Sequence, residues 1–263
     1  MKVSLLVILL VFASAAGRCQ ILNIDKNEVG EKDKKWLANL NLTLSSDQQK
    51  YNVLDIFFTG DVSYKHNARR YVFYGKIDRL TDGSQHIQDA GCFQLRDRIA
   101  TKKKFSLDYF VQYQWNGSWG LVNRSLAGTN FIQQWVNNDS VDFFTGIGVF
   151  YEHEHWNYSG VSAEKIPVNP VDIDVEHPRL NLTAKYARTF MKKYDFVTRF
   201  YNQSTIYKSQ FSCRTSLAFQ LNLPLTRKVV LATNAEAVYD TQPVVPVHNL
   251  LYGFSQSITV VIN

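Results

Sequence analysis

The segment 151–156, with the sequence YEHEHW, holds side chains able to bind a metal ion or to exchange protons. Zinc is bound by His, Cys and carboxylate side chains that converge on one point. In a β-strand, successive side chains point to opposite faces, so Glu152 and Glu154 lie on one side and His153 and His155 on the other. The four groups cannot surround one ion, and we expect neither a metal site nor a cofactor here.

A serine nucleophile beside these histidines would give acyl-transfer chemistry. That chemistry needs a serine hydroxyl within hydrogen-bond reach of an imidazole, which an acid or amide orients. No serine lies two residues from His153 or His155, no G-x-S-x-G motif occurs, and Ser159 falls in an expected loop. We therefore expect no catalytic residues and no enzyme. A lipid hydrolase or acyl-transfer enzyme remains the alternative.

The face that carries Glu152 predicts a different role, the filling of a polar interior. A turn near residue 137 would bring Arg124 close to Glu152 on the adjacent strand. Unpaired buried charges are costly, so mixed signs on one face predict Arg–carboxylate pairs. The residues expected to line this interior are Arg96, Asp108, Gln112, Arg124, Glu152, Glu154, Lys185, Arg199, Arg214 and Glu236.

Strands must position these side chains, because apolar residues recur at every second position along most of the chain. Leu40, Leu42 and Leu44 alternate with polar residues in 36–45, and 105–116 repeats the pattern. Only a period of two sorts the residues in this way. The expected strands are 36–45, 53–65, 69–79, 87–97, 105–116, 121–133, 141–156, 179–189, 194–203, 210–223, 228–239 and 252–263.

Twelve such segments predict an all-β fold, a closed antiparallel transmembrane β-barrel that is apolar outside and polar inside. The competing soluble β-sandwich or lipocalin-like barrel would turn its apolar face inward, and its strands average only about five to six residues. All six prolines fall in expected connections, which fits their exclusion from strand interiors. The two longest connections are 157–178 and 240–251.

The N-terminus predicts export. Residues 3–16 are almost wholly apolar and follow Lys2, which indicates a signal peptide over 1–19 that is too short to span a bilayer. A short periplasmic segment, 20–35, would precede a single barrel domain, 36–263. The expected location is the bacterial outer membrane, with outer-membrane lipids and lipopolysaccharide as neighbours and the barrel assembly machinery as a partner during insertion.

The formal charge of +6 does not indicate nucleic-acid binding, because the basic residues are scattered and no binding motif accompanies them. A barrel of about twelve strands lies between the eight-stranded kind filled by side chains and the porins with open channels. We expect a narrow passive pore or a structural envelope component with a charge-paired lumen. A surface-interaction protein using the loop 157–178 is a further alternative, and oligomeric state stays open.

Four patches, taken in order, carry a resemblance to a known family. They are 108–114 (DYFVQYQ), 124–128 (RSLAG), 146–154 (GIGVFYEHE) and 179–183 (RLNLT). Together they resemble the salt-induced outer-membrane protein family, bacterial barrel proteins whose domain has no known function. The resemblance runs from about residue 36 to the end of the chain. It implies an outer-membrane barrel and supplies no activity, ligand or catalytic residue.

Overall fold

The computed structural model describes residues 35–48, 52–82, 85–102, 104–191, 194–207, 210–226 and 229–260. The expected signal peptide and nearly all of the segment 20–35 lie outside these residues. The described strands are β1 (Trp36–Gln48), β2 (Asn52–His66), β3 (Arg69–Asp82), β4 (Gln85–Lys102), β5 (Phe105–Asn116), β6 (Leu121–Asn137), β7 (Val141–Trp156), β8 (Ile173–Phe190), β9 (Tyr194–Tyr207), β10 (Gln210–Pro224), β11 (Val229–Asp240) and β12 (Leu250–Val260). Two short 3-10 helices, η1 (Gly117–Trp119) and η2 (Ala163–Lys165), lie between strands.

The all-β antiparallel fold is confirmed. Each of the twelve expected segments overlaps one strand, and β5 and β7 have the expected bounds. The strands contain 11 to 18 residues, well above the soluble mean of about five to six. Neither described helix is long enough or apolar enough to span a membrane.

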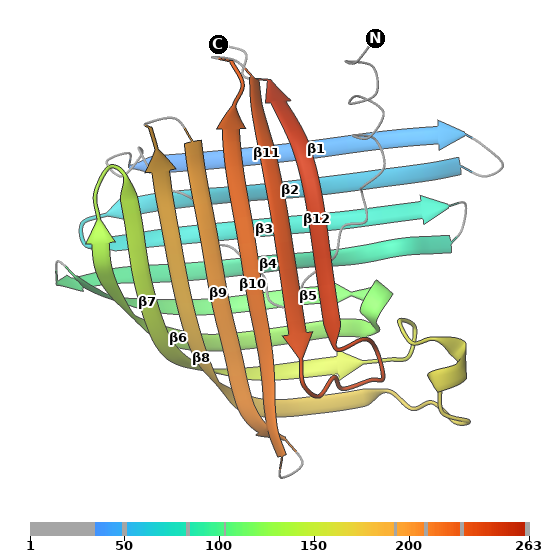
Figure 1. The fold of residues 1–263 in the computed structure, drawn as a ribbon. Helices are drawn as coiled ribbons and strands as arrows, with labels where there is room; N and C mark the ends of the chain where they lie inside the picture. Colours follow the sequence, from blue (N-terminus) through green and yellow to red (C-terminus); the bar gives the residue numbers. More distant parts are fainter. Residues whose placement is uncertain are drawn as a thin grey trace.

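The strands follow one another across a single twelve-stranded sheet, and each pairs antiparallel with the next in the chain. The sheet folds back on itself, so β1–β5 form one layer and β9–β12 cross in front of it (Figure 1). The long strands β6, β7 and β8 curve from one layer into the other. Side chains of the concave face therefore meet those of the opposite layer.

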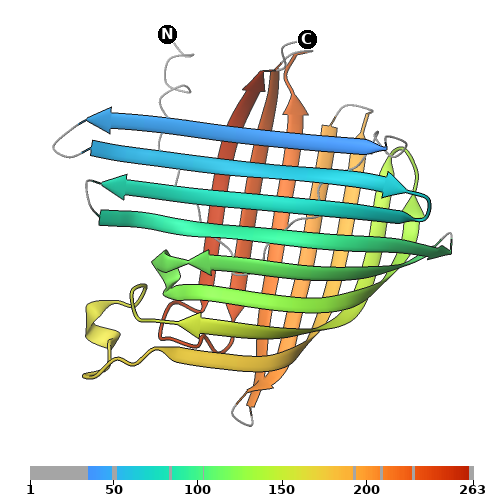
Figure 2. The ribbon, with the colours of Figure 1, turned by 180° about the vertical axis from the view of Figure 1, so that it is seen from behind.

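The expected closure of the barrel is not a feature of the described sheet. Among the described residues, β1 pairs with β2 and β12 pairs with β11, and these two edges do not pair with each other. Figures 1 and 2 show β1 running across the direction of β12 rather than beside it. A ladder needs neighbouring strands that run alongside in register, and closure depends on tilt and stagger. The sheet is thus curved and open.

The expected loop 157–178 also needs correction, because β8 begins at Ile173 and residues 173–178 are strand. Glu176 pairs with His153 of β7, and Pro178 pairs with Tyr151. The ladder between β8 and β9 begins only at Leu180, so Pro178 lies where the sheet has a free side, a position that tolerates proline. A second proline, Pro224, is the last residue of β10, so two of the six prolines lie in strands.

The two faces of the sheet have the polarity expected of the barrel and opposite to that of a soluble core. Leu40, Tyr109 and Leu217, on three well-separated strands, are 72%, 47% and 38% exposed. The largest fully buried side chains include Arg124, Arg214, Glu152, Glu154 and Asp108. Charged residues are rarely buried unless they are paired, and large exposed apolar surfaces mark contact with something other than water.

Close contact between β6 and β7 gives a test of this packing. A Cβ added at Gly128 would overlap the Cβ of Phe150 and the carbonyl oxygen of Val149. Gly128→Val should therefore lower the free energy of unfolding by about 1–3 kcal/mol, the usual cost of overpacking. The matched control is Ala127→Val, one residue away on the exposed outer face. Urea unfolding in detergent, followed by circular dichroism, measures the stability of both variants. Equal midpoints for the two variants would contradict the close contact between β6 and β7.

Candidate functional site

The interior holds a layer of charged side chains between the two layers of the sheet. Glu152 and Glu154 project inward from β7, Arg124 from β6, Arg179 from β8 and Arg214 from β10, and all five are at most 4% exposed. The alternation of β7 explains why both glutamates enter this layer while His153 and His155 do not. We call these five residues, with Asp240 of β11, the charge layer.

Each carboxylate of the charge layer has at least one arginine partner. The Nε of Arg124 donates to Glu152 Oε2 at 2.7 Å and lies 3.1 Å from Glu154 Oε1. Arg214 donates to Glu154 Oε1 at 2.8 Å and to Asp240 Oδ2 at 2.9 Å. Arg179 also donates to Glu152. Three guanidinium groups thus face three carboxylates, a balance that makes burial of the charges tolerable.

Two hydrogen bonds made by arginines of the charge layer join strands that are not neighbours in the sheet. Arg214 of β10 reaches Glu154 of β7, and Arg124 of β6 donates to Gln203 Oε1 of β9 at 3.1 Å. Both contacts cross the interior and tie the two layers together. Beside them lies a cavity of about 40 Å³, lined by Gln112, Asn130 and other residues of the concave face, which has room for a few water molecules.

Apolar residues cover the charge layer at one end. Leu121 and Trp156, at the ends of β6 and β7, are buried with Val161 of the loop 157–172 and Val245 of the loop 241–249. The indole Nε1 of Trp156 donates to Glu154 Oε2 at 3.0 Å, which links this apolar cover to the charges beneath it. In Figure 1 the two loops extend beyond the strand ends on the same side. The interior is filled and covered at this end.

Ser159, the serine nearest the histidines in sequence, helps to attach the cover. Its hydroxyl donates to the carbonyl oxygen of Gly117 at 2.9 Å and contacts Asn157 Oδ1 at 2.7 Å. The backbone N–H of Asn157 also donates to the carbonyl oxygen of Gly120, which has a φ of 77°. Ser159 therefore fixes the start of the loop 157–172 against the turn after η1.

Eight of the ten residues expected to line the interior are buried, and Arg96 and Glu236 are partly buried. The structure brings four of them together in the charge layer. Two others approach one another elsewhere, since Arg96 lies 3.7 Å from Asp108. Of the other four, Gln112 accepts from Gln94 and lines the cavity beside the charge layer, Lys185 lies 3.2 Å from Asp142, and Arg199 and Glu236 lie on β9 and β11.

Three interior residues outside the expected set lie beyond the ends of the expected strands, and a fourth, Arg179, lies within one. Arg98 makes two hydrogen bonds to Asp108, at 2.6 and 2.7 Å, but was placed in a connection. His177, whose Nε2 lies 3.0 Å from Glu152 Oε1, was placed in a loop. Asp240 lies one residue beyond an expected strand. Arg179 begins one, and its shared parity with Lys185 was the signal that could have identified it.

The outer face of β7 carries a different group of polar side chains. His155 Nδ1 lies 2.8 Å from Asp174 Oδ1, and its Nε2 lies 3.3 Å from Asp172 Oδ2. His153 Nε2 lies 3.5 Å from Asp174 Oδ1 and 3.8 Å from Glu176 Oε1. Within the described part of the chain, no group of three or more His, Cys, Asp or Glu is arranged to hold a metal ion.

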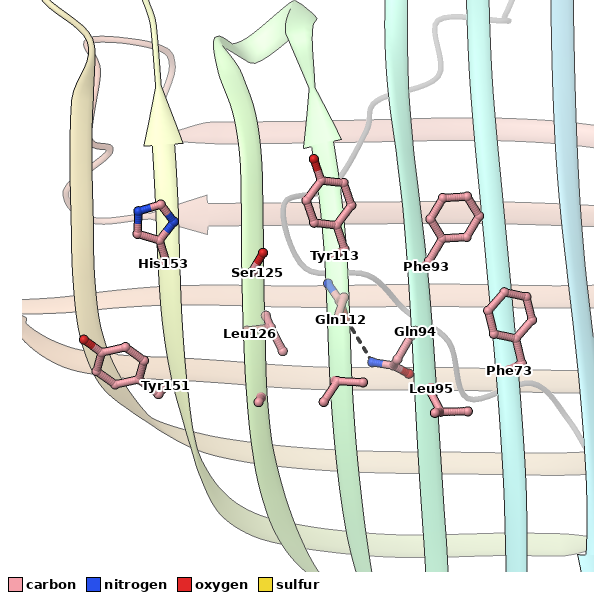
Figure 3. A pocket seen from close by; sticks show the side chains of 12 residues that line it. Phe73, Phe93, Gln94, Leu95, Gln112, Tyr113, Ser125, Leu126, Tyr151 and His153 are labelled. Carbon is pink, nitrogen blue, oxygen red and sulfur yellow. Dashed lines mark hydrogen bonds between the residues drawn. The ribbon is translucent and has the colours of Figure 1, made fainter.

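Next to His153 the outer wall has a groove of about 510 Å³. Apolar and aromatic side chains of β3 to β7 line it, including Phe73, Leu95 and Tyr151 (Figure 3). Ser125 of β6 lines the groove together with His153. Its hollow shape follows from small residues on β6 between larger ones on the adjacent strands.

Comparison with known families identifies the domain. A family model described as a protein of unknown function, DUF481, matches residues 46–246. The chain belongs to this family. No curated protein matches the chain. The description of this family names no function.

The charge layer yields a stability prediction. Arg214→Met leaves Glu154 and Asp240 short of a buried partner, so it should lower the free energy of unfolding by about 3–5 kcal/mol. Arg69→Met removes an exposed contact of 3.4 Å to Asp97 and should cost about 0–1 kcal/mol. The urea unfolding midpoints of the two variants, measured in the same detergent, give the comparison. Equal decreases in the free energy of unfolding would mean that the buried pairs stabilise the fold no more than the exposed pair does.

Proposed function

We propose that this protein is a bacterial outer-membrane β-barrel whose charge layer blocks most of its interior. The observation that carries the proposal is the polarity of the strands, whose outward rows expose large apolar side chains while the inward rows hold paired charges. A wall of this kind suits lipid on one side and a polar lumen on the other. The resemblance to salt-induced outer-membrane proteins supports the same location.

Closure of the sheet in the membrane is part of the proposal. An open sheet edge leaves unpaired N–H and C=O groups, and each such group costs several kcal/mol in hydrocarbon. We propose that β1 and β12 pair there and remove both edges. Strands of 11 to 18 residues meet or exceed the 9–11 that a tilted transmembrane strand requires. The assembly machinery of the outer membrane would insert such a chain.

The filled interior favours a structural envelope component over an open channel. Paired charges of both signs cross the lumen, and two loops cover one end of it. Selective channels instead present rings of one sign to the permeating ion. Any passage through this protein is therefore narrow and weakly selective between anions and cations. Outer-membrane lipids and lipopolysaccharide are its neighbours in this proposal.

A role in surface interaction is the second candidate, and the loop 157–172 favours it. Val168 is 98% exposed and Val171 is 73% exposed in this loop, beyond the end of the strands. Exposed apolar residues at a loop tip are suited to contact another molecule. The same loop both covers the interior and presents these two residues outward.

Membrane location can be tested at the middle of β7. Val149 is 56% exposed on the outer face, so Val149→Arg should destabilise the inserted state by about 2–4 kcal/mol, the cost of a cation facing mid-membrane lipid. Val168→Arg in the loop is the matched control and should insert normally. Folded protein in the outer-membrane fraction, identified by its heat-modifiable migration, is the measurement. Wild-type protein that stays folded and soluble without detergent would overturn the proposal.

Conductance tests the blocked interior. Wild-type protein in planar bilayers should pass little current, and Glu154→Ala/Arg214→Ala should raise conductance several-fold, because the bulky side chains are removed without changing the net charge. The control, Arg69→Ala/Asp97→Ala, also removes one arginine and one carboxylate without changing the net charge, but on the outer wall. Large wild-type currents that the interior variant leaves unchanged would show that the charge layer does not block the lumen.

A further inference from the structure

We propose that the outer wall carries a serine-dependent site for cleaving acyl esters, with Ser125 as nucleophile and His153 as base. The substrate class is an ester with a long acyl chain, such as a membrane glycerophospholipid. The site lies outside the charge layer and adds an activity to the proposed function. The site rests on the proposed function in one respect, because the outer-membrane location supplies its lipid substrate.

Three side chains form one row across three adjacent strands. Ser125 of β6 is the direct cross-strand partner of His153 of β7, and His153 is the direct partner of Glu176 of β8. Directly opposite residues have Cβ atoms about 4.5–5.5 Å apart on one face of the sheet. A side-chain rotation can bring a serine hydroxyl to an imidazole across this separation, and catalytic hydrogen bonds often tighten only when substrate binds.

The carboxylates on β8 supply the third part of a Ser–His–acid arrangement. His153 Nε2 lies 3.5 Å from Asp174 Oδ1 and 3.8 Å from Glu176 Oε1. An acid on one side of the ring orients it and stabilises the imidazolium that forms when the serine loses its proton. Glu176 is itself held, because the hydroxyl of Tyr151 donates to its Oε2 at 2.9 Å. Ser125 lies on the other side of His153, on β6.

The groove beside this row explains the choice of substrate. Its volume of about 510 Å³ falls in the range of small-molecule sites, which bind through apolar walls and a few polar groups. Figure 3 shows Ser125 and His153 on neighbouring strands, with Tyr113 and Phe93 on the strands beyond Ser125. An acyl chain can lie along the apolar lining while its ester group meets the serine. The outward position gives access from surrounding lipid.

The proposed reaction has two steps. Ser125 Oγ attacks the ester carbonyl carbon as His153 takes the hydroxyl proton, and the bond to the alcohol then breaks as His153 returns the proton to the departing oxygen. A water molecule next attacks the acyl-serine, again losing its proton to His153. The fatty acid leaves, and the proton returns to Ser125. Water is the co-reactant, and the enzyme ends unchanged.

Covalent labelling tests the nucleophile directly. Purified full-length protein in detergent is treated with an alkyl fluorophosphonate, in which a phosphorus–oxygen bond to serine forms and fluoride leaves. Peptide mass spectrometry should locate the label on Ser125. Labelling should disappear in Ser125→Ala and persist in Thr129→Ala, an outward residue on the same strand. A label on Ser159 or any other serine, or none at all, would overturn the proposal.

Turnover tests the base. Hydrolysis of p-nitrophenyl decanoate should fall about a hundredfold to ten-thousandfold in His153→Gln, as expected for loss of a general base. His155→Gln is the matched control and should retain activity, because His155 lies opposite Asn123 rather than a serine. Each variant must show wild-type heat-modifiable migration. Equal losses in both variants, with folding intact, would refute the role of His153.

The role of Glu176 as a positioning residue predicts a separate kinetic pattern. Glu176→Gln should lower kcat and leave KM nearly unchanged, because its carboxylate contacts the imidazole and not the acyl chain. A rise in KM at constant kcat would exclude this role.

Fatty acid released from phospholipid vesicles reports the natural substrate class. Turnover of the nitrophenyl ester without release of fatty acid from the vesicles would refute a membrane lipid as substrate.

The outcomes separate this site from the proposed function. Outer-membrane location with no labelling of Ser125 would leave the barrel proposal intact and remove the esterase. Labelling of Ser125 in a protein that proves soluble would keep the esterase chemistry and remove its lipid source.

Discussion

The pairing of three arginines with three carboxylates in the interior is the constraint on which the rest of the structure depends. Arg214 of β10 reaches Glu154 of β7, and Arg124 of β6 reaches Gln203 of β9, so these arginines link strands that the sheet itself does not join. Removing one member would leave a buried charge without its partner, which costs about 3–5 kcal/mol. The charge layer thus holds the two layers of the sheet together and leaves little room for a pore.

This interior determines what the other face must be. With polar groups facing inward, each strand turns its apolar side chains outward, and strands as far apart as β1 and β10 expose large ones. Water is a poor solvent for such a surface, and a lipid bilayer is a good one. The open edges at β1 and β12 would cost more free energy in a bilayer than in water. Their unpaired N–H and C=O groups can bond to water but find no partner in hydrocarbon.

One strand, β7, displays two different chemistries because its residues alternate. Glu152 and Glu154 belong to the charge layer, where paired charges are structural, whereas His153 and His155 meet acidic residues of β8 at the outer wall. The outer arrangement leaves its polar groups accessible beside an apolar groove. The inner arrangement satisfies them with each other. Chemistry is therefore better placed on the wall than in the lumen.

The sequence by itself determined the strands and their faces. Alternation over 105–116 and 141–156 predicted β5 and β7 to the residue, and parity assigned Arg124, Glu152 and Arg214 to the interior. These properties are local, because each depends only on the period of two along one strand. The error at 173–178 was also local. Ile173 and Val175 continue the alternation toward the expected strand at 179, yet the expected loop 157–178 includes them.

Only the tertiary structure decided which residues meet across strands. The register of β6 against β7 places Ser125 opposite His153, and the curvature of β6–β8 brings Arg214 of β10 to Glu154. Neither contact follows from spacing along the chain, because a register depends on bulges and turns between strands, such as the shift between Leu121 and Asn123. The open edge between β1 and β12 likewise reflects tilt and stagger summed over twelve strands. Local alternation sets the faces of a strand, but the sum of all strand pairings sets its neighbours.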